Sequence, residues 1–404
     1  MKKIIIPVLL FLFLIGNKGY SQPENYRRQT VFEANTNGYY IYRIPALAAT
    51  SKGTLLAFCS ARKGKGGDWD PIDIVLRRST DSGKTWSPPQ VIAHKDSLPC
   101  DNPMPVIDYQ TGEIHMLYQI DYARCYYTKS VDEGKSWSSP TDITYVIDEF
   151  KKIYDWNVLA PGPGHGIQMT NGRLVVPFWL STGGRKHRPS IVVSVYSDDH
   201  GKTWKPGEVA VPDNDTTVIP NETCCIQLAD GRVMFNSRNE SPNYRKLVTF
   251  SNDGATGWSA PYFTDAFFEP ICEASMCRYS LQPLQSKNRI LFCNPDSRQD
   301  PWMSDRKSTP RSVPNRHRTN LTMRMSYDEG ITWPVSKVID AGIAGYSDIA
   351  VTPDGMIHCL YEGGSLTQSH TLNNHVTVVS FSLEWLTDGK DKLDKKDKPL
   401  NRIK

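Results

Sequence analysis

Repetition at a spacing of about sixty residues constrains the fold of this chain more than any other feature of its sequence. Six short apolar runs recur at intervals of 57 to 67 residues; they begin at Gly53, Gly112, Gly172, Gly231, Asn288 and Gly355. The first run reads GTLLAF and the third reads GRLVVPF. A fixed period of this size is the signature of a repeat architecture, in which each repeat is one supersecondary unit.

A second, shorter repeat falls between the apolar runs. The octapeptide STDSGKTW spans Ser79–Trp86, three close copies end at Trp137, Trp204 and Trp333, and a degenerate copy ends at Trp258. Its Ser and Asp can hydrogen-bond to the backbone of a turn, its Gly supplies a positive φ, and its Trp can pack between repeats. The octapeptide is therefore predicted to be a structural turn and not the working part of the molecule.

The spacing of turn residues indicates an all-β chain. Gly, Pro, Asn and Asp interrupt the sequence every 8–12 residues, and no long stretch has an apolar period of 3.6 residues. Each repeat holds an apolar segment, a turn, one of the runs above, a further strand, the octapeptide and a last strand. Four antiparallel strands repeated six times predict a six-bladed β-propeller with the octapeptides as turns. A pair of β-sandwiches would not explain so even a period.

The two ends of the chain differ from the repeats. The N-terminus reads MKKIIIPVLLFLFLIGNKGYSQ, in which two lysines precede a short apolar run and Gly19 and Ser21 offer small residues for cleavage. Residues 1–21 are therefore predicted to be a secretory signal peptide, too short to span a membrane, and the protein to be periplasmic or secreted. Residues 22–388 are expected to form the propeller. Residues 389–404 mix both charges and are expected to be a disordered tail.

Charge and cysteine usage limit the classes of partner. The net charge is only +4 and the basic residues are scattered, so nucleic-acid binding gains no support. Nine cysteines form no CxxC pair, and no spacing of Cys and His suggests a metal site, so neither a metal nor another cofactor is expected. We expect a monomer with no membrane span.

The direction of the strands predicts which residues meet. Within one repeat, the start of the first strand, the end of the second and the start of the third share one edge, and the octapeptide lies at the other. Polar residues at the shared edge are Arg43, Arg62, Asp68, Asp70, Asp73, Asp101, Glu222, Arg238, Arg318, Tyr346 and Glu362. Arginine forks bind carboxylates and phosphates through paired hydrogen bonds, so this cluster predicts an anionic ligand.

These motifs together resemble the exo-sialidases (neuraminidases) of glycoside hydrolase family 33. The resemblance extends from Tyr39 to Trp385 and rests on YRIP at the first strand, the octapeptides (the Asp boxes of that family), Glu222 sixteen residues before Arg238, and GYSD followed by LYE. An Asp box alone occurs in unrelated propellers, whereas the full set in this order is specific. Two departures are the degenerate fourth box and a long basic loop over residues 300–318.

The resemblance implies a site for the carboxylate of a sialic acid. Arg43, Arg238 and Arg318 would surround that carboxylate, and Glu362 would brace Arg43. The expected partners are accordingly sialylated glycans.

The resemblance also implies the catalytic groups. Tyr346 would be the nucleophile, Glu222 its general base and Asp68 the acid/base, with no metal involved. The anomeric carbon of sialic acid carries a carboxylate that would repel a carboxylate nucleophile, whereas a phenol arrives neutral; sialidases are the tyrosine exception among glycosidases. The reaction would pass through a glycosyl-enzyme and retain configuration. Arg62 and Asp101 would line the pocket beyond the ring carbons, near the N-acyl group.

Two alternatives stay open. An intramolecular trans-sialidase, or a hydrolase of a related ulosonic acid such as Kdn or Kdo, would keep the arginines and Tyr346 but alter the pocket around Asp101. A non-catalytic Asp-box propeller that only binds sugar would be expected to lack Tyr346, Glu222 or Asp68, and all three are present.

Overall fold

Antiparallel sheets make up almost all of the described molecule. The computed structural model describes residues 25–299, 317–367, 369, 371–394 and 397, so the predicted signal peptide and most of the loop 300–318 lie outside the described residues. The short helical segments are α1 (Thr144–Asp148), η1 (Glu149–Lys152) and α2 (Leu383–Leu386). No helix in these ranges is long and apolar enough to cross a bilayer.

Four of the sheets each hold consecutive strands of the chain. The first contains β2 (Ile41–Ala49), β3 (Leu55–Arg62), β4 (Ile72–Ser79) and β5 (Gln90–Ala93); the second contains β6 (Cys100–Ile107), β7 (Ile114–Ile120), β8 (Arg124–Ser130) and β9 (Thr141–Asp142). The third contains β10 (Val158–Pro161), β12 (Leu174–Ser181), β13 (Ser190–Ser197) and β14 (Lys205–Val211), with β11 (Ile167–Gln168) beside β12. The fourth contains β15 (Thr223–Gln227), β16 (Val233–Ser237), β17 (Arg245–Ser251) and β18 (Tyr262–Phe268).

The remaining strands form one seven-stranded sheet. In spatial order they are β1 (Tyr26–Glu33), β24 (His375–Phe381), β23 (Ile357–Gly363), β22 (Val335–Val351), β21 (Thr319–Ser326), β20 (Arg289–Pro295) and β19 (Ser275–Ser280). Strand β22 is 17 residues long; its first part pairs with β21 and its second part, from Ala344, pairs with β23. The last two repeats are thereby joined, and the prediction of six separate blades is not confirmed.

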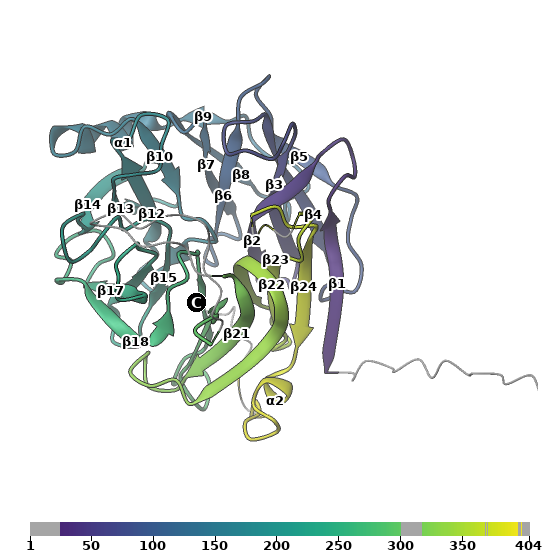
Figure 1. The fold of residues 1–404 in the computed structure, drawn as a ribbon. Coiled ribbons are helices and arrows are strands. Elements are labelled where there is room, and N and C mark those ends of the chain that lie inside the picture. The colour runs from purple at the N-terminus through teal and green to yellow at the C-terminus, as the bar shows by residue number, and fades with distance from the viewer. Residues whose placement is uncertain (1–24, 300–316, 368, 370, 395–396, 398–404) are drawn as a thin grey trace, which may run out of the picture.

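The sheets are arranged around a common centre, as in a propeller (Figure 1). Strand β2 contacts both β6 and β22, and β15 contacts β19, so the first strands of successive repeats meet at the axis. Strands β2 and β6 are buried at every position, whereas the outer strand β14 is partly exposed. This gradient follows because an inner strand has a neighbouring sheet on each face.

The octapeptides form the predicted turns. Ser79 Oγ accepts a hydrogen bond from Gly83 N at 2.8 Å, and Asp81 accepts bonds from the backbone of Lys84 and Thr85 at 3.0 and 2.9 Å. The degenerate copy forms a similar turn, because Asp253 still accepts a bond from Thr256 N, here at 2.7 Å. The prediction of a structural turn is confirmed.

The fourth residue of each intact octapeptide also links two repeats. These residues have φ values between 55° and 63°, which turns their side chains toward the preceding repeat. The resulting hydrogen bonds are Ser82 to Asp354 (2.8 Å), Thr50 to Glu133 (2.6 Å), His200 to Asp108 (2.6 Å) and Ala229 N to Glu329 (2.7 Å). Each partner lies in the turn between the first two strands of the neighbouring repeat, so the octapeptides hold adjacent repeats together.

Part of the predicted C-terminal tail is described. Asp391 is 5% exposed, and its carboxylate accepts hydrogen bonds from Arg289 at 2.7 and 2.9 Å. Lys287 and Tyr327 also donate to it. This carboxylate is therefore held against the seven-stranded sheet, in a segment whose sequence predicts disorder.

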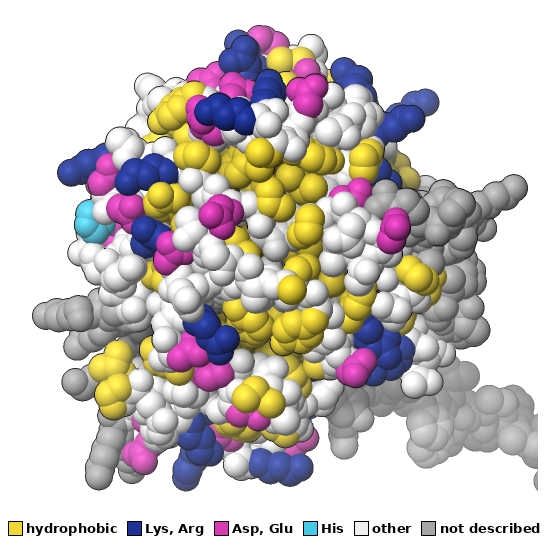
Figure 2. Space-filling model, turned by 90° about the vertical axis from the view of Figure 1, so that its left-hand side faces the viewer, with side chains coloured by type: hydrophobic (Ala, Val, Ile, Leu, Met, Phe, Trp, Pro, Cys, Tyr) yellow, Lys and Arg dark blue, Asp and Glu magenta, His cyan; other side chains and the backbone are white. Residues whose placement is uncertain are grey.

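Charges of both signs are mixed on the surface. On the face shown in Figure 2, lysine, arginine and acidic side chains are interspersed among apolar and polar ones.

Candidate active site

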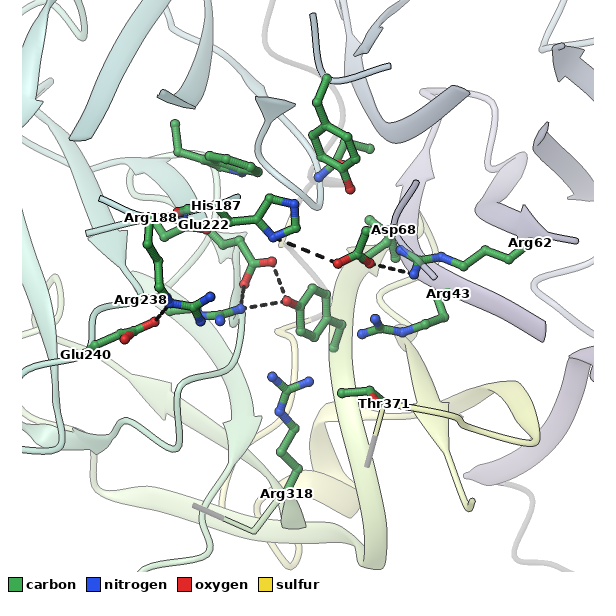
Figure 3. Close-up of a pocket in the computed structure, with 16 residues that line it drawn as sticks. Arg43, Arg62, Asp68, His187, Arg188, Glu222, Arg238, Glu240, Arg318 and Thr371 are labelled. Carbon is green, nitrogen blue, oxygen red and sulfur yellow. Dashed lines mark hydrogen bonds and ion pairs between the residues drawn. The ribbon is translucent and has the colours of Figure 1, made fainter. Parts of the chain in front are cut away.

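A cavity of about 170 Å³ lies at the edge that the strand directions predict. Of the nine proposed site residues, seven line it: Arg43, Arg62, Asp68, Glu222, Arg238, Arg318 and Tyr346. Figure 3 shows these side chains converging from several sheets. The other two, Asp101 and Glu362, lie behind the wall, where each is hydrogen-bonded to an arginine that lines the cavity.

Arg43 is fixed by a paired interaction with Glu362. Its Nε and Nη2 donate to the two carboxylate oxygens of Glu362 at 3.0 and 3.2 Å, and Ile44 N donates to the same carboxylate at 3.0 Å. Ile44 has a φ of 51°, and the register of β2 against β3 shifts between Arg43 and Ala46. This irregularity re-aims the Arg43 side chain, as β-bulges do next to functional sites.

Arg318 has hydrogen-bonding capacity that the described protein leaves unused. Its Nη2 donates to the carbonyl oxygen of Ile271 at 2.8 Å. Its Nε and Nη1 are buried, and neither has a hydrogen-bond partner in the described part of the chain. Because buried donors are nearly always satisfied in native proteins, these two N–H groups indicate a site for an acceptor that is supplied from outside.

Tyr346 lies between the guanidinium groups. The centre of the Arg43 guanidinium is 5.2 Å from the centroid of the Tyr346 ring, and that of Arg318 is 5.1 Å from it. Arg238 Nη1 donates to the phenol oxygen at 2.7 Å. Three cations thus surround one phenol at the floor of the cavity.

The phenol of Tyr346 also donates to Glu222, which in turn pairs with Arg238. Burial raises the pKa of Tyr346, although the nearby arginines oppose the rise, so the phenol is neutral. Burial would raise the pKa of Glu222 as well, but the charge of Arg238 and the hydrogen bonds from Tyr346 and Arg238 together outweigh it, so the pKa is lowered. The pair is therefore a neutral hydroxyl donor beside a charged carboxylate acceptor.

Asp68 is held as a carboxylate in this structure. It lies in the loop after β3, where its Oδ1 accepts a hydrogen bond from Arg62 Nη1 at 2.6 Å. Arg62 is fully buried and also donates to Gly66 O and to Asp101. Burial would raise the pKa of Asp68, but the surrounding positive charges, that of Arg62 foremost, and the hydrogen bond from Arg62 together outweigh it, so the pKa lies well below the usual range.

One wall of the cavity was not predicted from the sequence. It comes from the loop between β12 and β13, which contributes His187 and Arg188, and from Tyr122, Trp179 and Asn221. The loop follows β12, the second strand of the third repeat, so the direction of the strands also predicts it at the shared edge. The basic run Arg185–Arg188 was the available signal.

Metal ligands are not grouped in the described ranges. Among those residues, no cluster of three or more His, Cys, Asp or Glu side chains could hold a metal ion.

Residues 43–359 match the family model described as BNR repeat-like domain. The chain belongs to this family. A sialidase of Micromonospora viridifaciens is 29% identical to this BNR-repeat protein over 390 residues, which cover 89% of this chain and 54% of that protein. A sialidase of Bacteroides fragilis (strain YCH46) is 28% identical and covers 80% of this chain and 60% of its own length. The chain thus spans little more than half the length of these two relatives.

Solved structures show the same fold as this BNR-repeat protein. The Hadza microbial sialidase Hz136 superposes with a TM-score of 0.72 at 25% identity and covers 89% of this chain and 69% of that chain. The intramolecular trans-sialidase from Ruminococcus gnavus, solved with oseltamivir carboxylate, gives a TM-score of 0.70 at 18% identity over 89% of this chain and 98% of that chain. At 18% identity, the similarity to the second structure supports the fold and nothing further.

Proposed function

We propose that this protein is an exo-acting sialidase that hydrolyses terminal α-linked sialic acid with retention of configuration, through a tyrosyl-enzyme intermediate. The observation that carries the proposal is the group of three guanidiniums around the Tyr346–Glu222 pair. Two N–H groups of one of them, Arg318, have no partner among the described residues and are free to bind a ligand. The sialidases among the relatives support the same substrate class.

The arginines would bind and orient the carboxylate of the sugar. Arg43 and Arg238 are already positioned by Glu362 and Glu222, so little side-chain ordering is required when the substrate enters. The carboxylate would accept hydrogen bonds from the unused N–H groups of Arg318. This contact would place the anomeric carbon near the phenol oxygen of Tyr346.

The first chemical step would then form a bond between the phenol oxygen of Tyr346 and the anomeric carbon. The phenol proton passes to Glu222, the bond from the anomeric carbon to the leaving oxygen breaks, and that oxygen takes a proton from Asp68. In the second step water attacks the same carbon and gives a proton to Asp68. The tyrosyl oxygen leaves and recovers its proton from Glu222.

Asp68 must carry a proton in the first step, whereas its pairing with Arg62 favours the charged form. We therefore propose that bound substrate draws Arg62 away from Asp68 and toward the polar groups beyond the ring. Asp101, which also binds Arg62, would remain as its second anchor. Loss of the cation would let the pKa of Asp68 rise toward the range that a general acid needs.

The proposal also covers the number of blades, the export of the chain and its oligomeric state. The seven-stranded sheet is interpreted as two blades joined through β22, which would give six in all. The chain is expected to be exported after removal of residues 1–21, and to act as a monomer on sialylated glycans.

Proton NMR of the reaction with 3′- and 6′-sialyllactose tests the proposed function. We expect free sialic acid to appear first as the α-anomer, with the β-anomer following by mutarotation. The β-anomer as the first product would contradict retention, and a 2,7-anhydro product would identify an intramolecular trans-sialidase. Absence of turnover on every sialoside would remove the function.

A further inference from the structure

His187 lies at the roof of the cavity, against the proposed acid/base residue. Its Nδ1 is 3.9 Å from Asp68 Oδ2, the oxygen that does not contact Arg62. Figure 3 shows the imidazole on the same side of the cavity as Glu222, facing Asp68 across the opening. Asp68 therefore has two possible donors, one on each carboxylate oxygen: a permanent cation and an imidazole.

The ring of His187 is also packed against the loop that carries Asp68. Trp69, the next residue in the chain, stacks on His187 with ring centroids 4.8 Å apart and an interplanar angle of 21°. Tyr122 and Trp179 contact the same imidazole with centroids 5.1 and 5.2 Å away. Hydrogen bonds from Lys65 N and Gly67 N to Asp70, both 2.9 Å, hold the backbone of the Asp68 loop. The stack of Trp69 on His187 adds a contact between this loop and the opposite wall of the cavity.

The surroundings of His187 favour its neutral form. Burial lowers its pKa; the carboxylates of Asp68 and Glu222 oppose this effect, and Arg188 and Arg238 add to it. A neutral imidazole has one N–H donor and one acceptor nitrogen. Its Nε2 is buried and has no hydrogen-bond partner within the described ranges.

We propose that His187 is a positioning residue for Asp68: it stacks on Trp69 to hold the loop over the cavity and offers a neutral N–H to Asp68 when Arg62 turns to the substrate. This inference rests on the proposed function. A hydrogen bond from a neutral donor stabilises a carboxylate less than an arginine does, so Asp68 could both gain and release a proton beside it. No proton passes to or from His187. The proton of Asp68 goes to the leaving oxygen and is replaced from water.

Two substitutions separate the two parts of this role. His187→Phe keeps an aromatic ring to stack on Trp69 but removes the N–H, and His187→Ala removes both. His94→Phe is the matched control, because His94 also contacts an aspartate, Asp73, at 2.7 Å but lies outside the cavity.

The readout is kcat/KM on two substrates with different leaving groups. His187→Phe should lose roughly 10- to 100-fold on 3′-sialyllactose, which needs acid assistance, and about threefold or less on an activated aryl sialoside. In the pH profile of kcat/KM for His187→Phe, the limb that reports the ionisation of Asp68 should move to higher pH, because the carboxylate loses a hydrogen-bond donor. His187→Ala should lose more on both substrates. Parental values for His187→Phe, or equal losses on both substrates, would overturn the inference.

A second measurement does not depend on turnover. The imidazole of His187 is titrated by NMR in the parent and in Asp68→Asn, in which the neighbouring negative charge is gone. We expect the pKa of His187 to fall in Asp68→Asn, since the carboxylate raises it. An unchanged pKa of His187 would show that the two residues do not interact, even if the enzyme is active. Conversely, a parent protein that releases no sialic acid would refute the proposed function. The titration would still show whether His187 and Asp68 interact.

Discussion

The phenol of Tyr346 donates a hydrogen bond to the carboxylate of Glu222, which lies 124 residues earlier in the chain. The two residues come from different sheets, β22 and the segment just before β15, and Arg238 contacts both. A neutral donor beside a charged acceptor, buried among arginines, is the arrangement that the proposed attack of the phenol on the anomeric carbon would require.

Tyr346→Phe should therefore abolish the covalent route while leaving the fold intact. The ring is kept, so the melting temperature should change little, but kcat should fall at least about 100-fold, and Glu222→Gln should fall by a similar factor. In the parent, a fluorinated sialosyl fluoride should label the peptide that contains Tyr346, as read by mass spectrometry of a digest. A label on Glu222 or Asp68, or full activity of Tyr346→Phe, would contradict the mechanism.

Arg318→Lys should weaken ligand binding although the positive charge is kept. The fork of Arg318 offers two unused N–H groups in fixed geometry, and lysine cannot reproduce them. Each lost charge-assisted bond is worth about 1.5–3 kcal/mol, or roughly 10- to 150-fold in affinity. Calorimetry with an unsaturated sialic acid analogue measures this directly. Arg278→Lys, at the Glu329 contact, is the control and should bind like the parent; equal affinity of Arg318→Lys would exclude Arg318 from the carboxylate site.

Asp81→Ala should lower stability without lowering the activity of the folded protein. Asp81 accepts hydrogen bonds from the backbone and side chains of its own turn, away from the cavity. Loss of these bonds should cost about 1–3 kcal/mol in the free energy of unfolding. Urea unfolding compares the variant with Asp265→Ala, whose side chain is fully exposed. A variant that unfolds like the parent but has no turnover would show that the octapeptide has a part in catalysis.

Asp391→Asn should lower the melting temperature in a manner that depends on pH. Burial would raise the pKa of Asp391, but hydrogen bonds from Arg289 and Lys287 hold it at about 2. Because this folded-state value lies below the unfolded one, the carboxylate stabilises the protein above about pH 4 and loses that effect as the pH falls toward 2. Calorimetry should find a deficit of a few degrees at pH 7 that shrinks at about pH 3. Asp388→Asn, which is exposed, should show a much smaller deficit; an equal deficit at both pH values would contradict the assignment for Asp391.

The direction of successive antiparallel strands is enough to predict that the residues at the floor of the cavity lie close together. Arg43 lies near the start of β2, Glu222 directly precedes β15, and Tyr346 lies near the start of the part of β22 that pairs with β23. Arg62 ends β3 and Arg238 directly follows β16, so the meeting of these residues does not require any knowledge of loop shape. His187 was missed because its place depends on how far a loop folds over the cavity. In the structure the imidazole contacts Trp69 and Tyr122, which both belong to other repeats.

Two other features had no local signal. Strand β22 runs through Gly342 without a turn. The residues around Gly342 also suit a loop, so the sequence does not predict a continuous strand there. Asp391 lies in a stretch that reads as solvated, and its partner Arg289 is 102 residues away. A pairing over that distance leaves no periodic pattern to detect.

Strand β1 pairs with β24, so one edge of the seven-stranded sheet joins segments from opposite ends of the described chain. During synthesis, Tyr26–Glu33 leaves the ribosome long before His375–Phe381 exists and cannot make its native pairing until translation is nearly finished. An unpaired strand is a template for pairing with other chains. The newborn protein therefore passes through an interval in which its first strand is exposed to aggregation, and a chain that ends before β24 leaves β1 in that state permanently.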